Sequence, residues 1–346
     1  MTPWIRLGGP GGVPAHALGA VGDIEAVTEW PEGGTDLSFS LLTPGPGYPP
    51  QVTSKTPVDL MIGARPVWAG YLSELGADGA LKAKGAVTEG DSTPCLDASG
   101  MTTSIIDAAI DSAISRGELS WRRPASINAS AYGEASTTAS LNTVSDLLAA
   151  WQTEADTRVY VDPYRVVRVG SDPTVPEYHI LPGAEDLAWS ATAQADRLIG
   201  RYQADAAGTL ANVTATAPGA RAPYTVQLVD MTGRGVLTAS SASAILQGIL
   251  TDLVMGAWSG GVTISRYQLA GAPDLSILFE AAGRGLMVRK LGQPDPRPGR
   301  VPVGYVDFVV GQATWKPAEG TITLTPVGTE ARDLSAILAE NNLEAA

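Results

Sequence analysis

The side chains that could do acid–base or metal chemistry in this sequence are two histidines and four neighbouring pairs of carboxylates. His16 lies in a run rich in proline and glycine, and His179 alternates with apolar residues in a predicted strand, so ordinary loop and strand positions explain both. A glycosidase places its two carboxylates on opposite sides of a cleft, which sequence neighbours rarely do. We therefore interpret the pairs as solvated charges. They are Asp23 with Glu25, Glu89 with Asp91, Asp107 with Asp111, and Glu185 with Asp186.

The common catalytic and nucleotide-binding motifs are absent from the sequence. It contains no Gly-x-Ser-x-Gly elbow, no His-Glu-x-x-His pair, no P-loop and no dinucleotide fingerprint. The single cysteine, Cys95, excludes an internal disulfide and a multi-cysteine metal site, and a small buried residue or an unused thiol is its expected role. We expect no catalytic, cofactor-binding or metal-binding residues, and a protein that is not an enzyme.

The charge balance argues against a protein that grips nucleic acid. The formal net charge is −13 and the isoelectric point is about 4.6, whereas phosphate binding needs clustered lysine and arginine. No apolar run is long enough to cross a bilayer, and the first residues lack the regions of a signal peptide. We expect a protein that is made and kept in the cytoplasm until assembly, without membrane insertion.

Composition indicates a mainly β fold. The 39 glycines and 25 prolines are spread along the 346 residues, which is typical of many short strands joined by tight turns. The apolar content of 44% suffices for two or three cores of ordinary domain size. Alternation from Val58 to Thr88 predicts a β-meander, in which Gly70 marks a bulge and hence a curved, barrel-like sheet.

The clearest single element is a β-hairpin from Tyr305 to Pro326. Its first strand alternates polar and apolar side chains, Lys316–Gly320 supplies a turn, and its second strand alternates threonine with isoleucine and leucine. One face of the second strand therefore suits a core, and the other suits water or a partner. The candidate interface residues on that other face are Thr321, Thr323 and Thr325.

Helical periodicity occurs in four places. The runs Met101–Arg116 and Ser140–Asp156 each carry an apolar face, and a predicted hairpin follows at Arg158–Val169, so this region predicts a compact α+β insertion. A third helix is predicted at Ser241–Met255. A short C-terminal helix at Ala331–Asn341 is predicted to dock on a neighbour through Leu334, Ile337 and Leu338.

Three stretches resemble one protein family. They are VDLMIGARPVWAGYLSEL at Val58–Leu75, LNTVSDLLAAWQTEADTRVYVDPYRVVRV at Leu141–Val169, and the hairpin at Tyr305–Pro326. In order and spacing they are similar to the baseplate hub or tail-tip proteins of long-tailed bacteriophages, which are labelled minor tail proteins in phages of actinobacteria. The run Ala242–Leu253 also resembles a helix of that family.

The resemblance implies a homotrimer in which each chain contributes two barrel-like domains related to the tail-tube fold. Three chains would then form a pseudo-sixfold ring that adapts a sixfold tube to a threefold tip. The expected domains are a first barrel at 1–95, an α+β domain at 96–182, a second barrel at 183–328 and a helix or tail at 329–346. The implied neighbours are a distal tail protein, a tape measure protein and other tail-tip or fibre proteins.

The same resemblance implies a location in the virion tail tip, after assembly in the cytoplasm of the bacterial host. The ring would line a channel through which DNA passes without specific binding, and an acidic balance suits a lumen that repels phosphate. The threonine face of the hairpin then becomes the candidate for the lumen or for a neighbouring subunit.

Two alternatives stay open at this point. A sixfold distal tail protein would share the β-rich character, although the α+β insertion and the two β regions favour the hub. A carbohydrate-active or cell-wall-binding tail protein would use the eight scattered tryptophans and the carboxylate pairs.

Overall fold

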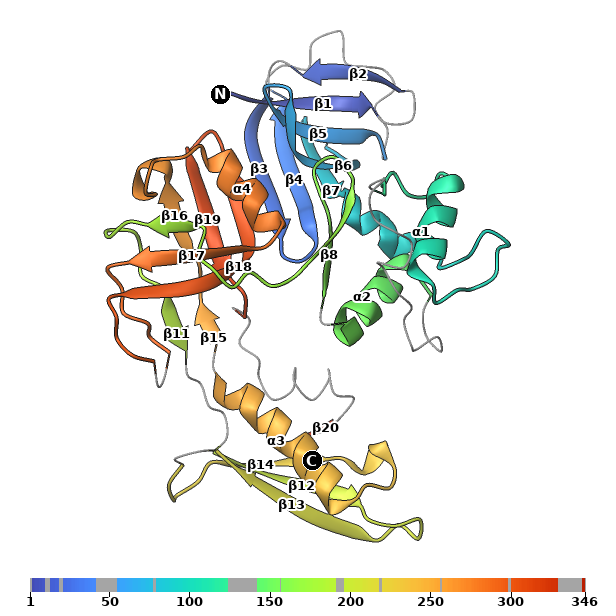
Figure 1. Ribbon diagram of the computed structural model, residues 1–346, viewed down its shortest axis with the longest axis vertical. Coiled ribbons are helices and arrows are strands. Elements are labelled where there is room, and N and C mark those ends of the chain that lie inside the picture. Colours follow the sequence, from blue (N-terminus) through green and yellow to red (C-terminus); the bar gives the residue numbers. More distant parts are fainter. Residues whose placement is uncertain are drawn as a thin grey trace. The chain divides into compact units, whose positions relative to one another are not determined.

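The chain folds into two compact units (Figure 1). The computed structural model describes residues 2–9, 13–18, 21–41, 55–76, 79–123, 142–155, 157–190, 196–217, 220–255, 257–297, 300–328 and 344–345. The first unit comprises Met1–Asp186, Gly261–Asp295 and Val301–Val327, and the second comprises Leu187–Gly260, Pro296–Arg300 and Gly328–Ala346. Strands hold far more of the described residues than helices, so the predicted mainly β class is confirmed. The predicted boundaries after residues 95, 182 and 328 stay a prediction.

One large sheet organises the first unit, and it curls on itself (Figure 1). Its main path runs β10-β17-β18-β3-β4-β7-β6-β5-β1-β2, with β19 and then β16 branching from β18, and β8 and then β9 branching from β4. The strands are β1 (Pro3–Gly9), β2 (Val13–Leu18), β3 (Val21–Glu29), β4 (Gly33–Leu41), β5 (Pro57–Ile62), β6 (Arg65–Leu75), β7 (Ala80–Gly85), β8 (Arg158–Val161), β9 (Val167–Gly170), β10 (Tyr178–Ile180), β16 (Val262–Ser265), β17 (Leu286–Leu291), β18 (Tyr305–Lys316) and β19 (Thr321–Pro326).

The long strand β18 joins strands from both ends of the chain. Its first half, up to Val310, pairs with β17, and its second half, from Gln312, pairs with β3 near the N-terminus. A register shift at Gly311 separates the two halves. β19 pairs antiparallel with β18, and Ile322 and Leu324 are fully buried, so the predicted hairpin is confirmed. On its other side β19 pairs with β16.

Helix α4 (Leu275–Gly283), which packs against β18 and β3, is absent from the predicted elements. The rings of Phe279 on α4 and Trp315 on β18 lie 5.6 Å apart. Gly283 is required where the helix meets β3, because a Cβ atom there would lie 2.3 Å from the hydroxyl oxygen of Thr28. The helical run is short and almost wholly apolar, and periodicity alone does not separate such a run from a buried strand.

Removing the N-cap of α4 should destabilise the first unit by about 1 kcal/mol. Asp274 precedes the helix, and its carboxylate accepts a hydrogen bond of 2.9 Å from the amide of Ser276. We expect Asp274→Ala to lower the free energy of unfolding, whereas Asp274→Asn should lose less because an amide oxygen can still cap the helix. Chemical denaturation of the three proteins measures this, and equal stability of all three would contradict it.

Two helices share a core with the β8–β9 hairpin. The helical elements of this region are η1 (Ala86–Ser92), α1 (Ile106–Ser115) and α2 (Val144–Ala155). The buried indole of Trp121 donates its ring N–H to the carbonyl of Ala86 at 2.6 Å. Cys95 lies in the same core with 1% of its surface exposed, as predicted for a small buried residue. The first helix begins at Ile106 and not at Met101, where the predicted run starts.

The second unit packs one helix on a small sheet (Figure 1). The sheet order is β13-β12-β14-β20, and β11 pairs separately with β15. The predicted helix is confirmed as α3, which buries Leu246 and Leu250 in the core that it shares with the sheet. The elements are β11 (Ala188–Ser190), β12 (Arg197–Gln203), β13 (Leu210–Thr216), β14 (Val226–Asp230), α3 (Ala239–Met255), β15 (Ala257–Ser259) and β20 (Glu344–Ala345).

Candidate functional site

The predicted threonine face lies opposite the core side of β19. The half-buried residues Thr321, Thr323 and Thr325 alternate with the buried residues of the hairpin. The hydroxyl oxygens of Thr323 and of Thr263 on β16 lie 2.9 Å apart, so the two strands are linked on this face by a side-chain hydrogen bond as well as by their backbones. The three threonines lie on the side of β19 away from the core, as the alternation in the sequence predicts. Their role at a lumen or an interface stays a prediction.

The other predicted interface residues cannot be placed. Leu334, Ile337 and Leu338, together with the C-terminal helix predicted to carry them, lie outside the described residues.

The threonine face continues across the sheet as a polar surface. Backbone pairing aligns the side chains in register rows that run from β16 through β19, β18, β3, β4 and β7 to β6. The side chains in these rows are all half-buried or exposed, and together we call them the polar face. The polar face consists of Glu25, Val27, Asp36, Ser38, Tyr71, Glu74, Lys82, Lys84, Thr263, Thr314, Lys316, Thr321 and Thr323.

Each lysine of the polar face has a carboxylate partner on the neighbouring strand. These hydrogen bonds raise the pKa of Lys84 and of Lys316, and they lower the pKa of Glu74. Exposed pairs of this kind add little stability. The pairs do weaken any binding of phosphate groups, because every lysine of the polar face is already compensated by a carboxylate. The pairs are Lys84–Asp36 at 2.6 Å, Lys82–Glu74 at 2.8 Å and Lys316–Glu25 at 3.3 Å.

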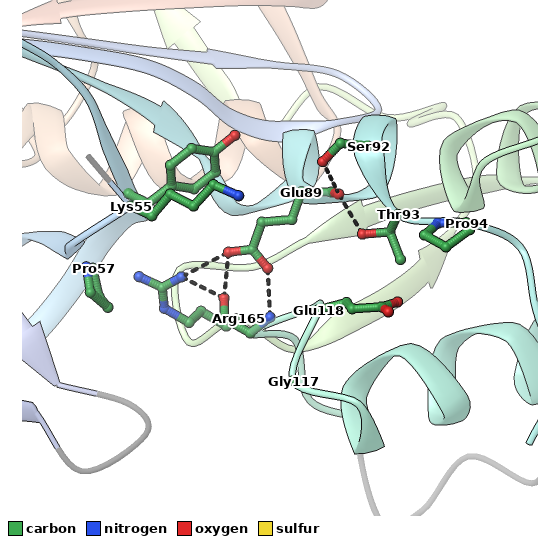
Figure 2. A pocket seen from close by; sticks show the side chains of 11 residues that line it. Lys55, Pro57, Glu89, Ser92, Thr93, Pro94, Gly117, Glu118 and Arg165 are labelled. Atoms are coloured by element: carbon green, nitrogen blue, oxygen red, sulfur yellow. Dashed lines mark hydrogen bonds and ion pairs between the residues drawn. The ribbon is translucent and has the colours of Figure 1, made fainter. Parts of the chain in front are cut away.

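The guanidinium group of Arg165 is the centre of a buried ion cluster (Figure 2). Arg165 lies in the turn between β8 and β9, is 2% exposed, and has a φ of 62°, in the left-handed region that favours glycine. It donates to the carbonyl of Gly70 at 2.6 Å and to the hydroxyl of Ser120 at 2.7 Å. The nearest guanidinium nitrogen lies 3.4 Å from Asp59 Oδ1, and another lies 3.6 Å from Glu89 Oε1.

Both carboxylates of the cluster are fully engaged. Asp59 also accepts hydrogen bonds of 2.9 and 2.7 Å from Arg6, and Glu89 accepts bonds of 2.5 and 2.6 Å from the amide and hydroxyl of Ser120. Because an unpaired charge in such a place is costly, the cluster holds Arg165 in its unusual backbone conformation. It ties β5, β6 and η1 to the β8–β9 hairpin.

A cavity of about 510 Å³ lies beside this cluster (Figure 2). The hydroxyl groups of Ser92 and Thr93 both donate to the backbone carbonyl of Glu89, at 3.5 and 2.7 Å, and the phenol of Tyr71 lies 3.1 Å from the hydroxyl of Thr88. The lining hydroxyl groups of Tyr71, Ser92 and Thr93 therefore bond to the protein itself. In the described ranges, no group of three or more His, Cys, Asp or Glu residues is placed to hold a metal ion.

Two of the carboxylates that we interpret as solvated from the sequence are not: Glu89, which belongs to the Arg165 cluster, and Asp107. Asp107 is only 5% exposed and is contacted by Arg123, whose Nε also lies 2.7 Å from Asp111. Burial raises the pKa of Asp107. Helical spacing predicts both carboxylates on the face opposite the apolar stripe of α1, which is wrong for Asp107, because it is buried in the structure. The spacing gives no sign that an arginine beyond the end of the helix returns to bridge them.

Across the described part of the chain, no helix combines the length and apolar character needed to cross a membrane.

Solved structures of phage tail proteins share this fold. The 43 kDa tail protein of prophage MuSo2 from Shewanella oneidensis matches with a TM-score of 0.53 and 11% identity, over 94% of this chain and 97% of that one. The tail protein from Neisseria meningitidis MC58 matches with a TM-score of 0.53 and 14% identity, over 94% and 96%. Prophage tail protein gp18 from Listeria monocytogenes EGD-e matches with a TM-score of 0.51 and 12% identity, over 98% of both chains.

No protein-family model and no curated protein matches the sequence. At the identities above, the structural likeness establishes the fold, which this chain shares with phage tail proteins over nearly its whole length.

Proposed function

We propose that the protein is a structural, non-enzymatic component of a phage tail and that it forms the ring of the baseplate hub at the tail tip. The observation that carries this proposal is the match of its fold to three phage tail proteins, each over at least 94% of this chain. The three stretches that resemble tail-tip proteins of phages of actinobacteria support the hub position. The chain would act in the virion, after assembly in the host cytoplasm, beside the distal tail and tape measure proteins.

In this proposal three copies form the ring, and the curled sheet of the first unit supplies two tube-like layers from each copy. Residues 187–260 form part of the separate second unit, so the second layer is built by residues 261–295 and 301–327. The strand β18, which pairs with both β17 and β3, connects the two layers. The α1–α2 region is the small α+β domain. In a ring, the unpaired strand edges of one copy can form backbone hydrogen bonds with the strand edges of the next copy.

The polar face is the surface that we assign to the channel. A channel for DNA has to avoid sticking, and a lysine that is already paired with a carboxylate has little left to offer a phosphate. The three lysines of the polar face meet this requirement through cross-strand pairs. The net charge of −13 works in the same direction.

A lysine introduced at Thr323 should impair the tail without unfolding the chain. The position is half-buried on the polar face, and its neighbours Thr263 and Thr314 carry no carboxylate to neutralise the new charge. We expect Thr323→Lys to change the free energy of unfolding by no more than about 1 kcal/mol, while the yield of infectious particles falls severalfold. Thr323→Ser is the matched control and should behave as the wild type. A normal yield of particles from the lysine variant would show that the face is wrongly assigned.

Two measurements separate this proposal from its alternatives. Counting the copies per tail distinguishes a threefold hub from a sixfold distal tail protein. Incubating the purified chain with host cell walls tests a carbohydrate-active role: release of sugar fragments, lost when one carboxylate is replaced, would overturn the structural proposal.

A further inference from the structure

Among the described strands of the second unit, β13 (Leu210–Thr216) is an edge of the sheet. Its seven residues pair with β12 in an unbroken antiparallel register, from Leu210 opposite Gln203 to Thr216 opposite Arg197. The strand order ends at β13, and no described strand pairs with its other side. The strand therefore presents a row of backbone N–H and C=O groups to another chain.

This edge lacks the features that usually protect an edge strand. Its sequence, LANVTAT, contains no charge, no proline and no glycine, and its register contains no bulge. Three other edge strands of the described sheets are protected: β2 contains Pro14, β9 carries Arg168, and β10 is three residues long. The edge strand β16 is also uncharged, but it has only four residues against the seven of β13. An uncharged and regular edge of this length is a template for strand pairing.

We propose that β13 pairs antiparallel with the β13 strand of a second copy of this chain, about a two-fold axis at Val213. In this register Ala211 faces Ala215 of the second copy, and Asn212 faces Thr214 of the second copy. Leu210, which is 55% exposed, gains Thr216 of the second copy as its neighbour. The facing side chains are small and uncharged, so the edge is complementary to itself.

The charges at the two ends of the strand are compatible with this occupant. Asp205 lies in the turn before Leu210, where its carboxylate accepts the amides of Ala207 and Thr209 at 3.0 and 2.9 Å. Arg197 lies at the opposite end, next to Thr216. Antiparallel pairing brings the Asp205 end of one copy to the end of the other that carries both Arg197 and Asp196, so no excess of like charge opposes the pairing at either end.

The pairing also extends the core of the unit. Val213 points toward α3 and is partly buried against the same cluster as Leu246. A second strand paired with β13 would cover the exposed side of Val213. The two small sheets would then form one continuous sheet.

The inference goes beyond the proposed function. A two-fold contact cannot be repeated inside a ring whose axis is polar, so the pairing belongs to the free chain and has to be released, or left outside the ring contacts, when a tail assembles. It would keep an exposed edge from pairing with other proteins before assembly.

Sedimentation of the full chain over a range of concentrations tests whether it dimerises. Charged residues introduced at Asn212 and Thr214 test the register of the pairing between the two β13 strands. Asn212 and Thr214 are exposed on the sheet side that faces away from α3, so charges there leave the fold intact. With lysine at both positions, each lysine faces a lysine of the second copy, and the dimerisation constant should weaken about tenfold or more. With Asn212→Lys and Thr214→Glu, each lysine faces a glutamate, and the dimer should persist.

A wild-type chain that stays monomeric up to high micromolar concentration would overturn the proposal. So would a dimer that both double variants retain equally, because that dimer would use another surface. The result is independent of the proposed function, since it is measured on the purified chain. The hub role is tested by the composition of assembled tails.

Discussion

Arg165→Ala should lower the free energy of unfolding by about 3 kcal/mol or more. The arginine is 2% exposed, and its guanidinium group bonds to Gly70 and Ser120 and neutralises Asp59 and Glu89. Alanine would leave these buried groups short of partners. Alanine would also keep the strain of a left-handed φ at a residue with a Cβ atom, without the ion cluster that offsets this strain. Urea denaturation followed by tryptophan fluorescence measures the loss.

Two further variants separate the causes of this loss. Arg168→Ala removes an arginine from the same hairpin whose side chain is 43% exposed and pairs with Asp162 at 2.9 Å, so it should cost no more than about 1 kcal/mol. Arg165→Gly removes the ion cluster but suits the φ of 62°, so it should be more stable than the alanine variant by about 0.5–1 kcal/mol. If Arg165→Ala and Arg168→Ala were equally stable, the cluster would not hold the turn.

Ile322→Asp should prevent the first unit from folding. The side chain is fully buried on β19, which lies between its hairpin partner β18 and the earlier strand β16. A carboxylate at this position would lose its hydration without gaining a partner, at a cost of more than about 4 kcal/mol, which is much of the stability of an ordinary domain. Circular dichroism and protease sensitivity check the outcome.

Ile322→Val is the matched control for this change. It removes one methylene group from the same place and should cost about 1 kcal/mol. Together with Thr323→Lys on the adjacent residue, these variants test both faces of one strand. A folded Ile322→Asp protein with an unchanged melting temperature would show that the core is assigned to the wrong face.

The hairpin was open to prediction from sequence because its information is local. Strict alternation in residues 321–325 fixes which side chains face the core, and the turn at Lys316–Gly320 fixes the pairing of the strands. Helix α3 was predictable for the same reason, since its apolar residues repeat at helical spacing. The polar face could be predicted only in part. Its threonines lie on one strand and show in the sequence pattern, whereas the other strands join the face through pairing between distant segments.

Features that depend on distant contacts could not be predicted in this way. Arg165 reaches Asp59 across more than a hundred residues of sequence, and the only local sign is a carboxylate inside the apolar run of β5. The pairing of β18 with β3 likewise joins the two ends of the chain and leaves no periodic trace. Helix α4 did offer a local signal, because Asp274 stands as an N-cap directly before its apolar run.

The proposed function is tested most directly by an image of a phage tail tip assembled with this chain, at a resolution that traces its strands. We expect a ring of three copies at the tip, with the polar face and its paired lysines turned toward the channel. A tip without this chain, a ring of six copies, or a polar face turned away from the channel would contradict this expectation.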